Sequence, residues 1–219
     1  MESEMNRKCV ILGGGDILDY GTVFAMIKAD DFIICADNGY RHCEKLGLLP
    51  SLLVGDFDSI VRLPPDVPRV TVPAEKDFTD TALALSCAVE RGYDTFLASG
   101  MMGGRRFDHT LGNLQILARH ARQGAKCFIT DGITDICILH SDSGSIHVVE
   151  PKKNHYFSLV SLTTSCENLS IAGAKYELTG YTLRFDETRG LSNEFTGVPV
   201  VVSWDSGTML LVVTPMDLP

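Results

Sequence analysis

The first indication of the fold is the stretch KCVILGGGD at residues 8–16. An apolar run that ends in glycines is typical of a buried strand leading into a helix. The glycines, at the start of a helix, are able to cradle a phosphate with their backbone amides, and we assign this contact to Gly14. A tight strand–helix turn without a ligand is the alternative. The loop is neither the G-x-G-x-x-G nor the Walker fingerprint.

Similar apolar runs alternate with helical patterns along the first part of the chain. The runs lie at residues 32–36, 52–54, 95–98 and 125–130, and the helical patterns at 17–27, 40–46, 79–89 and 109–122. This alternation is typical of a parallel sheet covered by helices on both faces. Residues 1–140 are therefore predicted to form a three-layer, Rossmann-like α/β domain.

The pattern changes after about residue 140. Short runs such as residues 156–160, 200–204 and 209–213 alternate with turns rich in Gly, Asn and Ser, and Asp205-Ser206-Gly207 is a hairpin signal. Residues 141–219 are therefore predicted to form an antiparallel β-sandwich domain.

Acidic residues gather after the predicted strands and at the helix starts. The candidates are Asp37, Asp56, Asp58, Asp77, Asp80 and Asp108. Ligands of open α/β sheets bind at the carboxyl ends of the strands, so several such ends with the same chemistry indicate one site. Two unit charges about 4 Å apart repel by about 4 kcal/mol at an effective dielectric constant of about 20, so such carboxylates favour a bound cation. Hard oxygen ligands beside glycine and arginine indicate Mg²⁺ and a polyphosphate.

The stretch GGRRFDH at residues 103–109 supplies the matching positive charge. Its glycines permit close approach of the backbone, and an arginine fork fits phosphate oxygens. Either Arg105 or Arg106 takes this role, and the other faces solvent. His109 either joins the site or packs locally, and Asn113 lies one turn further along the same helix.

Composition excludes several classes of protein. A net charge of −9 is unsuited to non-specific binding of nucleic acid. The seven cysteines include no CxxC pair and mostly lie in apolar runs, as expected of buried thiols in a reducing compartment. No apolar segment approaches the ~20 residues that span a bilayer, and the N-terminus lacks the pattern of a signal peptide. We therefore expect a cytoplasmic protein without a membrane partner.

The chain resembles the thiamin pyrophosphokinase (thiamine diphosphokinase) family over most of its length. The resemblance rests on five elements in order: Ala36-Asp37-Asn38-Gly39, Gly55-Asp56-Phe57-Asp58-Ser59, Glu75-Lys76-Asp77 with Thr79-Asp80, Gly103-Gly104-Arg105 with Asp108-His109 and Asn113, and Leu191-Ser192-Asn193-Glu194. Two departures occur: Asn38 stands where many members have Gly or Arg, and Arg106-Phe107 adds a residue to the commoner Gly-Gly-Arg-x-Asp-His spacing.

The resemblance implies transfer of a pyrophosphoryl group from ATP to the hydroxyl of thiamin, with release of AMP, by a homodimer whose β-domain helps to close a site shared between subunits. ATP would contact Gly14, Asp37, Asn38, Arg105, His109 and Asn113. Mg²⁺ would lie on Asp56, Asp58 and Asp80, while Asp77 or Asp108 accepts the alcohol proton or completes the metal shell. Ser192 and Asn193 would bind thiamin, and Trp204 either stacks on its pyrimidine or packs in the core.

Two alternative functions are also compatible with the sequence. One is a related pyrophosphokinase that acts on another alcohol, such as a hydroxymethylpterin. The other is a nucleotide-binding module without catalytic activity. A panel of alcohols tested with ATP distinguishes the first alternative from an enzyme that acts on thiamin. Metal-dependent release of AMP distinguishes an enzyme from the non-catalytic module.

Overall fold

The structure is a computed structural model, and it describes residues 8–57, 64–71 and 77–217. Contacts between residues divide the chain into two units. The first unit extends to Leu117 and includes Gly124–Gly132, and the second contains Ala118–Gln123 and everything from Ile133 onward. The strand Asp135–Ser141 thus belongs to the second unit, ahead of the boundary expected after residue 140.

The first unit contains a parallel sheet in the order β6-β5-β1-β2-β3-β4. Its strands are β1 (Lys8–Leu12), β2 (Phe32–Ala36), β3 (Leu52–Gly55), β4 (Arg69–Thr71), β5 (Thr95–Ser99) and β6 (Lys126–Thr130). All neighbouring strands within this set pair in parallel. The predicted parallel sheet is confirmed.

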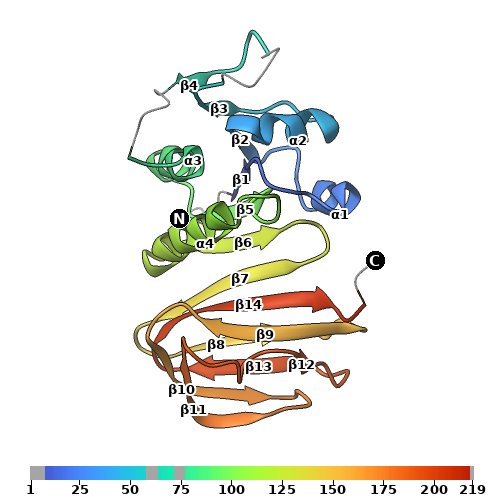
Figure 1. Cartoon of the computed structure of the whole chain (residues 1–219), viewed down its shortest axis with the longest axis vertical. Coiled ribbons are helices and arrows are strands. Elements are labelled where there is room, and N and C mark those ends of the chain that lie inside the picture. Colours follow the sequence, from blue (N-terminus) through green and yellow to red (C-terminus); the bar gives the residue numbers. More distant parts are fainter. Residues whose placement is uncertain (1–7, 58–63, 72–76, 218–219) are drawn as a thin grey trace, which may run out of the picture. The chain divides into compact units, whose positions relative to one another are not determined.

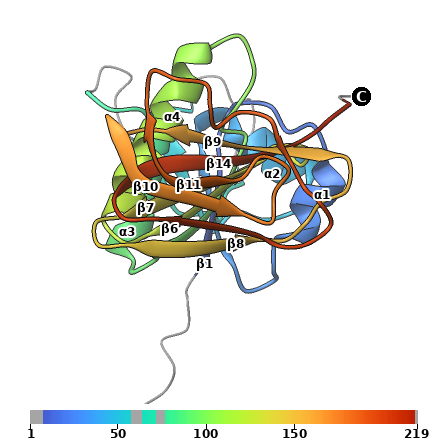
Figure 2. The same cartoon turned by 90° about the horizontal axis from the view of Figure 1, so that it is seen from below.

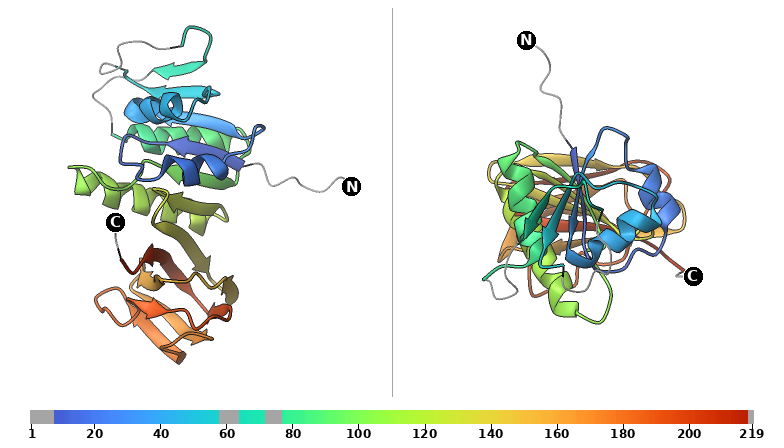
Figure 3. Two further views of the ribbon diagram at one scale, coloured as in Figure 1. Left: turned by 90° about the vertical axis from the view of Figure 1, so that its right-hand side faces the viewer. Right: turned by 90° about the horizontal axis from the view of Figure 1, so that it is seen from above.

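Helices cover both faces of this sheet. They are α1 (Tyr20–Ala25), α2 (Tyr40–Lys45), α3 (Asp80–Glu90) and α4 (Phe107–Arg122), with a short 3₁₀ helix η1 (Asp37–Gly39) after β2. Figure 1 shows α1 and α2 on one side of the sheet and α3 and α4 on the other, and the view from above in Figure 3 shows the same three layers. Thr79 caps the N-terminus of α3, because its Oγ1 accepts a hydrogen bond from the Ala82 amide at 3.2 Å.

β1 marks the switch point of the sheet. Strands β2 to β4 continue from β1 in one direction, whereas β5 and β6 continue in the other. In sheets of this kind the connections on the two sides diverge at the carboxyl ends of the central strands, and a crevice opens there. The sheet therefore predicts a binding site beyond the ends of β1 and β5.

The second unit consists of two antiparallel sheets, in the orders β12-β9-β14-β7 and β11-β10-β13-β8. Its strands are β7 (Asp135–Ser141), β8 (Ser145–Val149), β9 (His155–Ser161), β10 (Ser165–Ala172), β11 (Leu178–Arg184), β12 (Asn193–Glu194), β13 (Val200–Trp204) and β14 (Gly207–Pro215). One core cluster draws buried side chains from both sheets, among them Phe157, Leu211, Leu169 and Val202. Figure 2 looks at this unit from below, with β10 and β11 in front of β9 and β14. The predicted β-sandwich is confirmed.

All seven cysteines are free thiols, and six of them are buried. In the described ranges no helix has the length and apolar character needed to span a membrane.

Candidate active site

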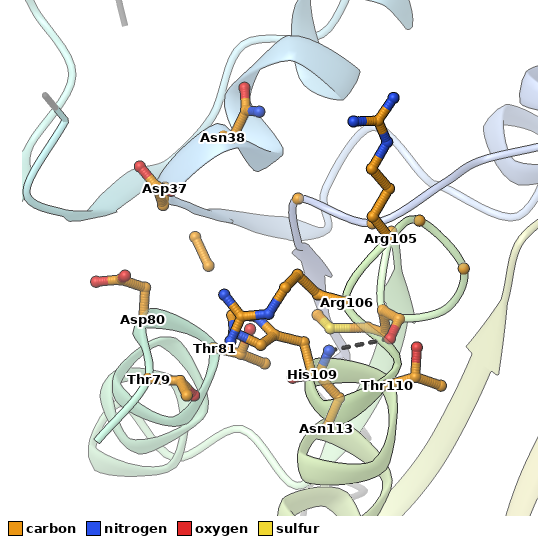
Figure 4. Close-up of a pocket in the computed structure, with 17 residues that line it drawn as sticks. Asp37, Asn38, Thr79, Asp80, Thr81, Arg105, Arg106, His109, Thr110 and Asn113 are labelled. Carbon is orange, nitrogen blue, oxygen red and sulfur yellow. Dashed lines mark hydrogen bonds between the residues drawn. The ribbon is translucent and has the colours of Figure 1, made fainter. Parts of the chain in front are cut away.

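A cavity of about 350 Å³ opens at the switch point of the first unit (Figure 4). It lies beyond the carboxyl ends of β1, β2 and β5 and is bordered by the N-terminal turns of α3 and α4. Its lining is Gly14, Gly15, Ala36, Asp37, Asn38, Thr79, Asp80, Thr81, Gly100, Met101, Gly103, Gly104, Arg105, Arg106, His109, Thr110 and Asn113. Seven predicted site residues are thus brought together: Gly14, Asp37, Asn38, Asp80, Arg105, His109 and Asn113.

The glycine loop, residues 13–15, is tied to the segment that follows β5. The Gly13 amide donates to the Ser99 carbonyl at 2.8 Å, and the Gly15 amide donates to the Gly100 carbonyl at 2.7 Å. A Cβ on Gly15 would lie 2.5 Å from the Met102 carbonyl oxygen, which is why glycine is required there. These two amides therefore serve the tight turn, and Gly14 is the loop residue between them that lines the cavity.

The backbone is strained where β2 ends. Asp37 has φ 46°, in the left-handed region that few residues other than glycine adopt. Gly39 follows in η1, and a Cβ at that position would lie 1.9 Å from the Leu12 carbonyl oxygen. Phe57, directly after Asp56, has φ 57°. Strained positions of this kind concentrate at functional sites. Asp37 and Phe57 both lie within the predicted acidic clusters.

The acidic candidates divide into three groups. Asp37 and Asp80 line the cavity. Asp56 follows Gly55, which lies against Asp37 where β2 and β3 end, but neither Asp56 nor Asp77 is part of the lining. Asp58 lies outside the described residues. Within the described ranges no three His, Cys, Asp or Glu side chains gather closely enough to hold a metal ion without other ligands.

Arg106 and Asp108 form an ion pair, with Nη2 2.6 Å from Oδ2. Hydrogen bonding to Arg106 lowers the pKa of Asp108 to about 2. Figure 4 shows the Arg106 guanidinium directed toward Thr81 at the start of α3, whereas Arg105 points away from Thr81. Both arginines belong to the lining, and Asp108 does not.

α4 contributes His109 and Asn113 from its first turns. Asn113 Nδ2 donates to the Met101 carbonyl at 2.9 Å, which holds the segment after β5 against the helix (Figure 4). Its amide oxygen remains the group with which it would accept a hydrogen bond from a ligand. Two threonines of the lining, Thr81 and Thr110, are not among the predicted site residues, although each is adjacent to one of them; Thr79 was named only as part of a family motif.

The three residues predicted to bind thiamin lie in the second unit. Asn193 is 5% exposed, and its side chain is engaged with Tyr176: Oδ1 accepts from the Tyr176 amide at 3.0 Å, and Nδ2 donates to the Tyr176 carbonyl at 2.7 Å. Trp204 is 3% exposed and belongs to the core cluster of the sandwich, a position that favours core packing over stacking on a ligand. Ser192 is exposed and has φ 57°.

A second cavity, of about 340 Å³, lies in the sandwich beside Ser192. It is lined by Ile171, Tyr176, Glu177, Leu178, Arg189, Gly190, Leu191 and Asn193. The Asn193–Tyr176 hydrogen bonds thus shape one wall of this cavity, and Asn193 acts on it through the Tyr176 backbone.

Comparison with known proteins gives consistent results for both units. Residues 24–129 match the family model described as thiamin pyrophosphokinase, catalytic domain, and residues 144–209 match thiamin pyrophosphokinase, vitamin B1 binding domain. The chain is 30% identical to the thiamine pyrophosphokinase of Bacillus subtilis (strain 168) over 185 residues, which cover 82% of this chain and 85% of that protein.

Solved structures resemble the fold over nearly the whole chain. The crystal structure of thiamine pyrophosphokinase from Bacillus subtilis has a TM-score of 0.84 at 25% identity and covers 96% of this chain and 100% of that one. The crystal structure of thiamin pyrophosphokinase from Geobacillus thermodenitrificans has a TM-score of 0.80 at 26% identity. It covers 94% of this chain and 97% of that one.

Proposed function

Since the chain belongs to the thiamin pyrophosphokinase family, we propose that it transfers a pyrophosphoryl group from ATP to the hydroxyl of thiamin, giving thiamin diphosphate and AMP. The observation that carries this proposal is the cavity at the switch point, where carboxylates, glycines and arginines from separate elements meet. Transfer of phosphoryl groups depends on positioning and on neutralising charge, and these residue types supply both.

The proposed metal is Mg²⁺. Mg²⁺ takes oxygen ligands and in nucleotide sites is held by one or two carboxylates together with phosphate oxygens and water. Asp37 and Asp80 in the lining, and Asp56 beside Asp37, provide carboxylates of this kind. The donor set therefore fits Mg²⁺ shared with a triphosphate, and Asp56, Asp58 and Asp80 remain the proposed protein ligands. When bound, the ion would neutralise charge on the phosphates.

The arginines and α4 would hold the phosphates from the other side. Arg106 is directed into the cavity, and a charged guanidinium there stabilises negative charge that develops on the migrating group. Gly14, Asn38, His109 and Asn113 would complete the contacts to ATP, with Arg105 as the alternative phosphate ligand.

The second cavity is the proposed place of the thiamin rings, next to Ser192. Tyr176, Leu178 and Leu191 give it apolar and aromatic walls, and such walls suit a flat heteroaromatic ligand.

We further propose a cytoplasmic homodimer in which the sandwich of one subunit completes the site of the other. Light scattering tests the dimer, and a fully active monomer would contradict it.

The match to the vitamin B1 binding domain does not favour the two alternative functions, an enzyme that acts on a pterin-type alcohol and a module without catalytic activity.

The deciding experiment is to incubate the purified protein with ATP, Mg²⁺ and thiamin and to separate the nucleotides. Attack at the β-phosphorus yields AMP and thiamin diphosphate in equal amounts. ADP with thiamin monophosphate would show that only the terminal phosphate moves and would overturn the proposal. A panel of other alcohols under the same conditions tests the specificity for thiamin.

A further inference from the structure

His42, on α2, is a buried histidine that is bonded through both ring nitrogens. It is 2% exposed. Nε2 lies 2.8 Å from the carbonyl oxygen of Gly15, and Nδ1 lies 2.6 Å from the hydroxyl oxygen of Tyr20 at the start of α1. Because Gly15 lines the cavity, the imidazole connects the cavity wall to two helices.

The partners of the ring favour one tautomer of the neutral imidazole. Nε2 has two neighbours, the Gly15 carbonyl oxygen at 2.8 Å and the Nε donor of Arg41 at 3.4 Å. The carbonyl oxygen is the nearer one and only accepts hydrogen bonds, so Nε2 carries a proton. Burial lowers the pKa of His42, which favours the neutral ring. Nδ1 is then an acceptor, and the Tyr20 hydroxyl donates to it. Tyr20 therefore selects the tautomer that Gly15 requires.

The neighbouring residue on α2 holds the same loop. Arg41 Nη2 donates to the carbonyl oxygens of Gly14 at 2.8 Å and of Gly15 at 3.0 Å. The His42 ring also lies against the segment after β5, since a Cβ on Gly100 would be 3.2 Å from Cδ2 of His42. Two adjacent residues of one helix thus fix the carbonyl groups of the glycine loop on its α2 side.

We propose that His42, with Tyr20, is a positioning pair for the phosphates of the nucleotide. A peptide carbonyl carries partial negative charge and would repel an anionic phosphate. Hydrogen bonds from α2 keep the Gly14 and Gly15 carbonyls engaged, so the loop presents Gly14 to the cavity in one conformation. This inference rests on the proposed function, because it assumes that the cavity binds ATP.

The sharpest test compares two amides at position 42. In His42→Gln the side-chain nitrogen occupies the place of Nε2 and still donates to Gly15. In His42→Asn the shorter amide reaches only the place of Nδ1, and the bond to Gly15 is lost. We expect His42→Asn to raise the KM for ATP about three- to tenfold, the range given by the net free energy of one hydrogen bond, with kcat and the KM for thiamin unchanged. His42→Gln is expected to restore a KM for ATP close to that of the wild type.

Equal KM values for ATP in the two variants would overturn the positioning role, as would a fall in kcat alone. Tyr20→Phe removes one hydroxyl from the protein and keeps the test decisive if a variant at position 42 fails to fold. It should raise the KM for ATP in the same direction, and ¹⁵N NMR of the ring should show the loss of the pure Nε2–H tautomer. An unchanged NMR signal and KM in Tyr20→Phe would contradict the pair.

A direct binding measurement separates this inference from the proposed function. The Kd of Mg²⁺-ATP, measured by equilibrium dialysis, requires no turnover. If the wild type binds ATP but releases no AMP, the proposed reaction is wrong, while the ratio of Kd values between His42→Asn and His42→Gln still tests the positioning pair. If AMP is released and this ratio is one, the positioning pair alone is wrong.

Discussion

Arg106 holds the carboxylate of Asp108 through its Nε and Nη2 atoms, at 2.9 Å from Oδ1 and 2.6 Å from Oδ2 respectively. Both side chains are about two-thirds exposed, at 67% and 63%, so the pair contributes little to folding. The ion pair instead affects the orientation of Arg106 and the pKa of Asp108. The carboxylate orients the guanidinium beside the cavity, and the pKa of Asp108 falls to about 2.

Asp108 is therefore expected to have no part in the pH dependence of catalysis. A carboxyl with a lowered pKa is ionised everywhere above its ordinary value of 3.8, and it protonates only as the pH falls toward about 2. We predict that Asp108→Asn leaves the acid limb of the kcat/KM profile unchanged between about pH 5 and 8. Measuring the profile of this variant beside that of Asp77→Asn checks the prediction. Loss of an acid limb in Asp108→Asn alone would make it the general base.

Arg105 and Arg106 are expected to contribute differently to catalysis. Arg106 is directed toward the start of α3 and Arg105 away from it, so Arg106→Ala should lower kcat/KM by about 100-fold, and Arg105→Ala by about tenfold or less. Initial rates at varied ATP give both values. A larger loss in Arg105→Ala would assign the phosphate contact to that residue.

Asp56→Asn and Asp58→Asn are each predicted to reduce kcat by at least about 100-fold while leaving the fold intact, because each removes charge from the proposed Mg²⁺ site. Circular dichroism and the rate of AMP release measure the two properties. Asp30→Asn, an exposed residue of the first unit outside the cavity lining, is the matched control. Near-normal activity in both variants would remove these residues from the site.

Trp204 is predicted to stabilise the sandwich without contacting thiamin. Its Nε1 is buried and has no hydrogen-bond partner among the described residues, so Trp204→Phe removes an unsatisfied donor together with some volume. Trp204→Ala should cost about 3–5 kcal/mol of unfolding free energy, and Trp204→Phe clearly less. The KM for thiamin should be unchanged in Trp204→Phe. A large rise in that KM, with stability retained, would favour stacking.

The sequence predicted the parts of the fold that follow from local pattern. Each buried strand of the first unit coincides with an apolar run, and the site residues were found because they follow strand ends. β4 was missed, since Arg69–Thr71 has two exposed residues and no apolar run. The start of α3 near Thr79 follows from the helical pattern, whereas the place of Thr79 in the cavity lining depends on residues from other elements, such as His109 on α4.

Roles set by distant partners were not predictable. Asn193 engages Tyr176, 17 positions away, and Arg41 reaches Gly14 across 27 positions. Nothing in either neighbourhood of the sequence indicates these bonds. Likewise, Trp204 lies at the end of a strand with alternating burial, and only packing against the other sheet of the sandwich determines that its side chain faces the core.

The central place of β1 has a consequence for synthesis of the chain. One neighbour of β1, β2, follows it closely in the sequence, whereas the other, β5, is made much later, and the glycine loop is tied to residues 99 and 100. A nascent chain that ends before α4 therefore has the first half of the cavity without its opposite wall. Because such long-range pairings form late, we expect the growing chain to be unable to retain a nucleotide until β5 and α4 have emerged from the ribosome.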